Sequence, residues 1–234
     1  STVVYFPVAH WVFDFDSGDK DPGGWIANQL KAIDFAGGTA VHINAGIAGL
    51  AAALVIGKRV GFGREGFKPH NLTLVMIGAG LLWFGWFGFN AGSAVASNAT
   101  AGVTFLNTFV ATGAAMLAWL IVEKIRDGRA TSLGAASGVV AGLVAITPSC
   151  SAVNPLGAIA LGAIAGVLCA LAVGLKYKLG YDDSLDVVGV HGVGGLLGML
   201  FIGFGATISA NAAGKDGLFF KGGTDLLQSQ VIAI

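Results

Sequence analysis

Two histidines lie inside long apolar stretches of the chain, and each of them follows an aspartate. One segment reads D-F-A-G-G-T-A-V-H from Asp34 to His42, and the other reads D-V-V-G-V-H from Asp186 to His191. A titratable side chain in hydrocarbon is costly, and where it occurs it faces a bundle interior, an aqueous cavity or another polar group. The two segments therefore predict a site for a conducted or proton-exchanging species.

The composition around these histidines is typical of an integral membrane protein. Of the 234 residues, 55% are hydrophobic and 11% are charged, and the mean hydropathy is +0.77. Ordinary soluble domains carry far more charge and are less apolar. The formal net charge is zero, so the charge balance indicates no nucleic-acid partner.

Long runs without Lys, Arg, Asp or Glu divide the chain into membrane-spanning segments. The runs cover 35–57, 69–122, 130–175 and 187–214. A spanning helix needs about 20 residues, so these runs accommodate one, two, two and one helix. We predict an all-α polytopic membrane helix bundle, formed by a single domain over residues 1–234. Its complete spans are expected at about 35–57, 70–92, 101–123, 131–147, 156–176 and 186–208.

The basic residues indicate how these helices are oriented. They cluster in every second connector: Lys58, Arg59, Arg64 and Lys68; Lys124, Arg126 and Arg129; Lys176 and Lys178. The remaining connectors are uncharged hairpins and an acidic loop with Asp14, Asp16, Asp19 and Asp21. Short loops rich in Lys and Arg stay on the cytoplasmic side. We therefore expect a multi-pass protein of the cell membrane, the inner or plasma membrane, with Asp34 outside and Gly57 inside.

The two histidine segments resemble each other and run in opposite directions. V-H-I-N-A-G-I-A-G-L from Val41 and V-H-G-V-G-G-L-L-G from Val190 share the Val-His pair and many small residues. Antiparallel segments of this kind are typical of inverted repeats around a site near the midplane. With Asp34 and Asp186 both at the interface, the helix rise would place the histidines roughly 10 Å apart in depth. The two histidines meet only if Asp186 lies inside its span, where its carboxylate would have to cap a helix or form hydrogen bonds. The two aspartates are therefore not equivalent.

Five strings in this chain resemble the ammonium transporter family. They are D-F-A-G-G-T-A-V-H-I-N-A-G from Asp34, G-K-R-V-G-F-G from Gly57, K-P-H-N-L from Lys68, W-F-G-F-N-A-G-S from Trp86 and D-V-V-G-V-H-G-V-G-G from Asp186. The family includes the Amt and Mep proteins and, more distantly, the Rhesus proteins. The motifs are long, specific and in the family's order along nearly the whole chain, which looks most similar to actinobacterial members.

The resemblance implies a fold of eleven membrane helices, in two inverted halves of five plus a last helix, assembled as a homotrimer with one pore in each subunit. This chain would cover the end of helix 4 to the start of helix 11, so we expect an incomplete inverted-repeat channel fold. The chain opens without Met and stops in an apolar stretch. We therefore expect further residues before Ser1 and after Ile234.

The resemblance also assigns roles to individual residues along a pore. His42 and His191 match the family's twin pore histidines, which hydrogen-bond to each other. Trp86 and Val187 match apolar positions that line the pore. Phe89 matches one of two stacked phenyl rings that gate the outer mouth, and its partner would lie before Ser1.

Further residues are expected to belong to the outer recruitment site and its support. Ser93 matches the hydroxyl that binds the recruited cation, and Asp34 matches a carboxylate that orients backbone and supports ammonium selection without lining the pore. Asp186 is expected to have a structural role of the same kind. Where many members have a recruiting tryptophan, A-H-W-V-F from Ala9 ends in Phe13. Because cation–π attraction is strongest for Trp, we expect weaker recruitment here.

These assignments imply transport of ammonium, ammonia and methylammonium. An outer site would recruit the cation, the cation would lose its proton, and ammonia would pass along the twin histidines. No enzymatic activity, cofactor or metal is expected, and the surroundings are membrane lipid. A PII-type signal protein could contact the basic connectors, although these also suit an ordinary solvated inner face. Two alternatives stay open: an ammonium sensor without conduction, and a membrane protein whose two histidines ligate haem.

Overall fold

The structure is a computed structural model that describes residues 1–15 and 22–234, so Asp16, Asp19 and Asp21 of the predicted acidic loop lie outside the described residues. The described residues form helices without a β-sheet, which confirms the all-α prediction. The α-helices are α1 (Tyr5–Phe13), α2 (Trp25–Asn28), α3 (Asn44–Ile56), α4 (Leu72–Gly92), α5 (Ala99–Asp127), α6 (Ser132–Ile146), α7 (Pro155–Ala172), α8 (Leu175–Leu179), α9 (Val193–Gly205) and α10 (Asp225–Ile232). Two π-helices, η1 (Gly38–Ile43) and η2 (Val188–Gly192), precede α3 and α9, and a 3₁₀ turn, η3 (Leu218–Phe220), precedes α10.

Five helices of the described chain are long and apolar enough to cross a membrane. They are Gly38–Ile56, Leu72–Gly92, Ala99–Asp127, Pro155–Leu179 and Val188–Gly205. The first and last of these each join a π-turn to an α-helix. The span predicted at 131–147 corresponds to α6, which has 15 residues and is shorter than the usual span of about 20. The chain is thus a multi-pass membrane protein, and a sixth crossing by α6 stays a prediction.

The boundaries of the long helices follow from capping side chains in the connectors. Asn71, Asn98, Thr131 and Asn154 precede α4 to α7, and each side chain accepts the N–H of the third residue beyond it. Such caps satisfy backbone donors that a helix start leaves free. These polar residues in the connectors therefore end the apolar runs and begin the next helix.

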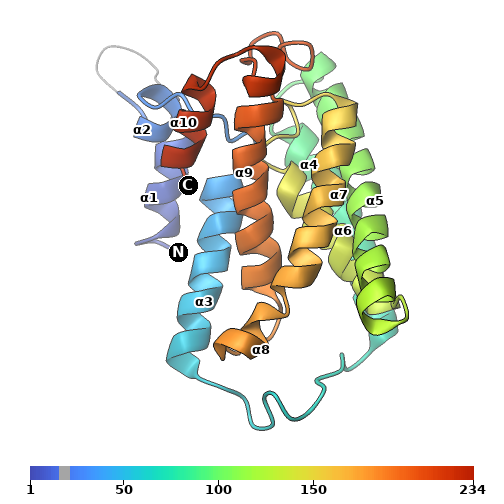
Figure 1. Ribbon diagram of the computed structural model, residues 1–234. Helices are drawn as coiled ribbons and strands as arrows, with labels where there is room; N and C mark the ends of the chain where they lie inside the picture. Colours follow the sequence, from blue (N-terminus) through green and yellow to red (C-terminus); the bar gives the residue numbers. More distant parts are fainter. Residues whose placement is uncertain (16–21) are drawn as a thin grey trace.

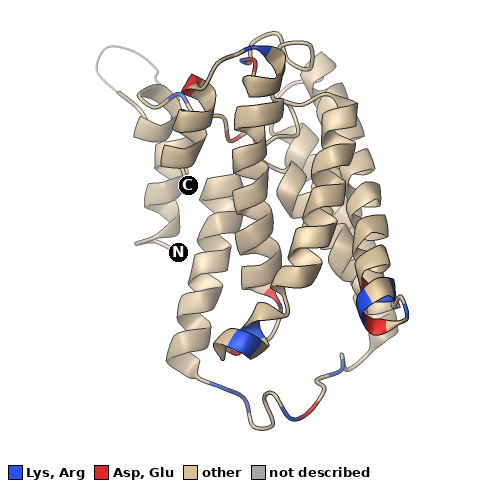
Figure 2. Cartoon of the chain, in the orientation of Figure 1, with Lys and Arg blue, Asp and Glu red and all other residues tan. Residues whose placement is uncertain are grey.

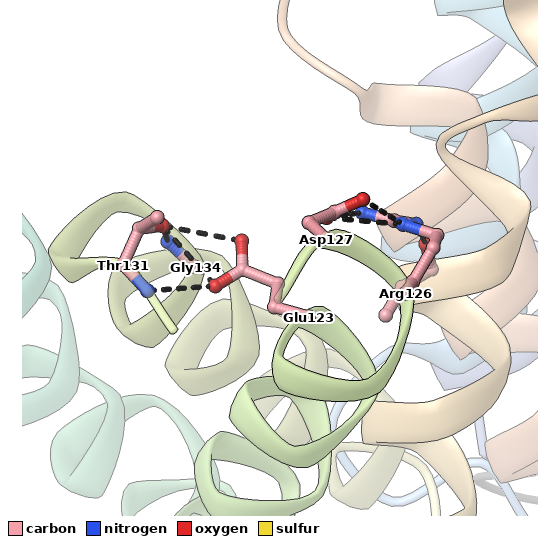
Figure 3. Close-up of polar contacts among 6 residues, drawn as sticks. Glu123, Arg126, Asp127, Thr131 and Gly134 are labelled. Atoms are coloured by element: carbon pink, nitrogen blue, oxygen red, sulfur yellow. Dashed lines mark hydrogen bonds and ion pairs between the residues drawn. The ribbon is translucent and has the colours of Figure 1, made fainter. Parts of the chain in front are cut away.

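A carboxylate strengthens the turn between α5 and α6. Glu123 accepts hydrogen bonds from the backbone N–H and the hydroxyl of Thr131, while Arg126 pairs with Asp127 on the opposite side of the helix end (Figure 3). Thr131 in turn caps α6 through the N–H of Gly134. The short connector therefore holds the two helices as an antiparallel hairpin.

Helices α5, α6 and α7 pack closely because small residues face each other. A Cβ added at Gly162 or Gly166 of α7 would collide with the backbone carbonyl of Ala111 or Ala115 of α5. Membrane helices use such small residues to let their backbones approach. The resulting three-helix layer forms one side of the molecule (Figure 1).

The two histidine segments lie side by side in the middle of the bundle. In Figure 1, η1 and α3 run toward the lower end, and η2 and α9 run back toward the upper end. Buried Ile43, Met199 and Ile202 belong to the core between them. Figure 2 shows the Lys and Arg residues of the connector 57–71, of α8 and of the end of α5 at the same lower end. Charged residues also lie at the upper end in Figure 2, so the orientation of the lower end toward the cytoplasm stays a prediction.

Candidate functional site

The structure brings His42 and His191 into direct contact. Their Nδ1 atoms are 3.1 Å apart, and the ring centroids are 5.2 Å apart. His42 is 2% exposed. A neutral imidazole has one donor and one acceptor nitrogen, so one of the two rings carries its proton on Nδ1 and the other carries it on Nε2. The contact therefore specifies opposite tautomers for the neutral pair.

Each histidine lies in a single turn of π-helix, and a carboxylate caps each turn. Asp34 accepts the N–H groups of the residues that begin η1, with the longest contact, from Ala40, at 3.4 Å. Asp183 accepts the N–H of Val187 at 3.0 Å and that of Val188 at 2.7 Å. Isolated π-turns are rare and occur often at functional sites. The caps satisfy backbone donors where the wide turns begin.

Asp183, and not Asp186, is the counterpart of Asp34. Both capping carboxylates precede their histidine by eight positions, so the predicted mismatch in depth disappears once Asp183 takes this place. The equal spacing was a signal available in D-D-S-L-D-V-V-G-V-H, but the shorter match from Asp186 obscured it. Asp186 has a structural role of another kind: it accepts from Lys176 Nζ at 2.6 Å and has a φ of 59°.

Trp86 stacks on His42 and is held from behind by a polar network. The two rings are 5.4 Å apart with an interplanar angle of 15°. The indole N–H of Trp86 donates to the Thr147 hydroxyl at 2.8 Å, which itself lies 2.7 Å from the Leu143 carbonyl and 3.2 Å from Asn90 Oδ1. Thr147 and Asn90 are 0% exposed. The sequence reasoning missed both residues, because no pattern links positions on different helices.

A hollow of about 970 Å³, called the outer hollow because it lies at the end of the bundle predicted to face outside, contains the predicted recruitment residues. Phe13, Phe89, Ser93 and Asp34 are among its lining residues. The ring of Phe89 lies 6.4 Å from that of His42, and the Ser93 hydroxyl donates to the Phe89 carbonyl at 2.8 Å. The hollow is therefore bordered by aromatic rings and a hydroxyl, and His42 lies behind the ring of Phe89 without lining the hollow itself.

A smaller hollow of about 300 Å³ lies on the other side of the pair. His191, Asp186 and Ser137 are among the residues that line it. Val187, which was expected to line the pore, borders neither hollow, and its side chain lies over Gly49 of α3. The absence of a side chain at Gly49 lets Val187 pack between the two histidine segments, and its place along a pore stays a prediction.

No group of three or more His, Cys, Asp or Glu residues in the described chain could hold a metal ion. Two nitrogens on opposite sides of one metal ion would be about 4 Å apart, because each metal–nitrogen bond needs about 2 Å, so the 3.1 Å contact between the Nδ1 atoms does not fit axial ligation of a haem. The arrangement suits hydrogen bonding between the rings and to a small third molecule.

Comparisons with known proteins give one consistent result. The family described as Ammonium Transporter Family matches residues 1–234. An ammonium transporter of Mycobacterium tuberculosis (strain ATCC 25618 / H37Rv) is 64% identical over 99% of this chain and 50% of its own length. An ammonium transporter of Bacillus subtilis (strain 168) is 48% identical over 100% of this chain and 55% of its own length.

Solved structures agree with the sequence matches. The crystal structure of Candida albicans Mep2 has a TM-score of 0.89 at 35% identity, and the match covers 99% of this chain and 51% of the Mep2 chain. A structure described as a sensor Amt protein has a TM-score of 0.84 at 34% identity, and the match covers 99% of this chain and 57% of the sensor's chain. The chain spans about half the length of the curated relatives it matches.

Proposed function

Because the chain belongs to the ammonium transporter family, we propose that it supplies the histidine-lined part of a pore that conducts ammonium nitrogen as ammonia. The outer hollow would recruit the ammonium cation, the cation would lose its proton near Phe89 and Trp86, and ammonia would pass His42 and His191. Relatives named as transporters move a substrate, so we assign no enzymatic activity.

The observation that carries this proposal is the direct contact of the two histidines, of which His191 lines the smaller hollow and His42 lies beside Phe89 of the outer hollow. An isolated ammonium ion buried in an apolar passage would pay a prohibitive desolvation cost, whereas neutral ammonia would not. Nε2 of His42 is buried and has no hydrogen-bond partner among the described residues. Buried polar atoms of this kind normally have a partner, and a passing ammonia molecule can donate to it or accept from it.

The outer hollow supports cation recruitment through three kinds of group. Phe13 and Phe89 provide ring faces that attract cations, and Ser93 provides a hydroxyl. The carboxylate of Asp34 is bound to backbone N–H groups, so its part is to order that backbone and not to ligate the cation directly. The rings and the hydroxyl would therefore contact the cation, while the carboxylate would hold the backbone around them.

Two alternatives make different predictions. A sensor without conduction is suggested by the likeness to a sensor Amt protein, and uptake measurements distinguish it from a transporter. Ligation of haem by the two histidines finds no support in their direct contact at 3.1 Å. A homotrimer and a PII-type signal protein at the basic inner connectors stay proposals that follow from the family.

Uptake of labelled methylammonium by proteoliposomes tests the proposal. The experiment uses the full-length gene product, with His42→Ala, His191→Ala and the control His70→Ala, which changes an exposed histidine in the connector 57–71. We expect the first two substitutions to abolish uptake and the control to preserve it. Unchanged uptake by His42→Ala and His191→Ala would contradict the proposed path, and wild-type protein that binds methylammonium without uptake would favour the sensor.

A further inference from the structure

One ion pair, buried on its Asp182 side, joins the connector 57–71 to the bundle. The side chain of Asp182 is 1% exposed and that of Arg59 is 40% exposed. Arg59 donates to Asp182 from its backbone N–H at 2.8 Å, from Nε at 2.8 Å and from Nη2 at 2.7 Å. The guanidinium carbon also lies 4.0 Å from the ring centroid of Phe67. Such a forked, charge-assisted contact constrains both direction and distance.

The residue after Asp182 is the cap of the π-turn that holds His191. Asp183 binds the N–H groups of Val187 and Val188, so a shift of this cap would move the start of the turn. The backbone carbonyl of Asp183 accepts from Lys176 Nζ at 3.0 Å. Segment 182–186 is therefore held by Arg59 at one end and by Lys176 at the other.

The segment needs such attachments because part of it is conformationally disfavoured. Asp186 has a φ of 59°, in the left-handed region that costs energy for a residue with a Cβ. Residues in sparsely populated conformations persist when surrounding contacts hold them there. The ion pairs of Arg59 and Lys176 supply those contacts on the cytoplasmic side.

The two histidine segments also cross closely at a pair of glycines. A Cβ on Gly46 of α3 would lie 2.5 Å from the Cα of Gly192 of η2, and both glycines are close in sequence to a histidine. At Gly46 and Gly192 the two backbones meet without side chains between them, whereas Ile43, Met199 and Ile202 pack between the segments where η1 meets α9. Arg59, just beyond the end of α3, and Asp182, just before η2, provide a second attachment at the inner ends.

The outer cap has an equivalent attachment of different chemistry. Ile33 precedes Asp34, and Gln230 of α10 accepts its N–H at 2.7 Å and donates to its carbonyl at 2.8 Å. Gln230 is 0% exposed. Both caps are thus held through the residue before them, one by a buried neutral amide and the other by a partly exposed guanidinium.

From these contacts we infer that Arg59 is a positioning residue for His191, acting through Asp182 and the Asp183 cap. This inference rests on the proposed function and adds a residue remote from the pore to the transport machinery. Removal of the guanidinium leaves a buried carboxylate uncompensated beside the cap, and the π-turn then loses the fixed position that the histidine contact requires.

Methylammonium uptake by the full-length gene product in proteoliposomes tests the inference. Arg59→Ala should lower the maximal rate by about tenfold or more and leave KM within about twofold, because the outer site is untouched. Arg59→Lys keeps the positive charge but cannot donate from two nitrogens to the carboxylate of Asp182, and it should lower the rate by about threefold. The double variant Arg59→Ala with Asp182→Asn removes the unpaired charge and should transport faster than Arg59→Ala.

Arg126→Ala is the matched control, because Arg126 also forms an ion pair with an aspartate at the cytoplasmic end but lies on α5 (Figures 2 and 3). The maximal rates are compared only among variants that elute from a size-exclusion column like the wild type and have its thermal stability, so that misfolded protein is excluded. A folded Arg59→Ala with the rate of the control overturns the inference. If Arg59→Ala is not recovered folded, an unchanged rate for Arg59→Lys overturns it. Failure of the wild type to transport would instead contradict the proposed function.

Discussion

Asp34 and Asp183 hold equivalent positions in the two halves of the site. Each precedes a histidine by eight positions, and each carboxylate caps the π-turn in which that histidine lies. Because the rise from cap to histidine is similar on both sides, two segments that enter from opposite ends meet ring to ring. The histidine contact thus depends on two carboxylates that do not touch the rings.

Loss of either cap should destabilise the protein. In Asp34→Ala and Asp183→Ala, the backbone N–H groups at the start of η1 or η2 lose their acceptor, and we expect a cost of about 1–3 kcal/mol. The Asn variants keep one acceptor oxygen and should lose less. Thermal unfolding of the detergent-solubilised protein measures this, with the exposed Asp225→Ala as the control. Equal stability of the Ala variants and the control would show that the caps contribute nothing.

The hydroxyl of Thr147 should set the orientation of Trp86. Thr147→Val removes the acceptor of the indole N–H at nearly constant volume, and a lost hydrogen bond of about 1 kcal/mol corresponds to an approximately fivefold lower uptake rate. Thr147→Ser should remain close to wild type. Thr112→Val is the control, because this buried hydroxyl donates to the Thr108 carbonyl of its own helix. Similar uptake rates for Thr147→Val and Thr112→Val would show that the hydrogen bond from Trp86 to Thr147 does not affect transport.

Phe13→Trp should strengthen cation recruitment. Tryptophan attracts cations more strongly than phenylalanine, and a gain of about 0.5–1 kcal/mol would lower KM for methylammonium by roughly two- to fivefold. The control Phe84→Trp makes the same change on α4, where Phe84 is 78% exposed. An unchanged KM for Phe13→Trp would indicate that Phe13 takes no part in recruitment.

The ion pair at the inner end should give a stability difference that disappears in acid. Hydrogen bonding from Arg59 lowers the pKa of Asp182 to about 2, below the value of about 3.9 for an unfolded chain. A lowered pKa contributes stability above the unfolded value, and this contribution is lost as the pH falls from about 4 to about 2. The Tm difference between wild type and Asp182→Asn should therefore shrink between pH 5 and pH 2. A constant difference over that range would contradict this linkage.

The membrane class, the helical fold and the histidine pair were predictable from the sequence. Charge-free runs report which segments partition into hydrocarbon, and that property depends on composition alone. The motifs around Asp34, Trp86 and Asp186 led to the family that the comparisons establish. The polar residues between the runs, such as Asn71 and Asn154, mark helix starts because capping is local along the chain.

Only the tertiary structure decided which residues act on the histidines. The role of Asp183 as the cap of η2 and the packing of Val187 on Gly49 are contacts that were not predicted from the sequence. The contacts of Trp86 with Thr147 and of Arg59 with Asp182 join residues 61 and 123 positions apart. Hydropathy and spacing describe each segment by itself, whereas these contacts depend on how packed segments are rotated against one another. The sequence by itself therefore determined that two histidines lie in the membrane, and packing decided how they meet.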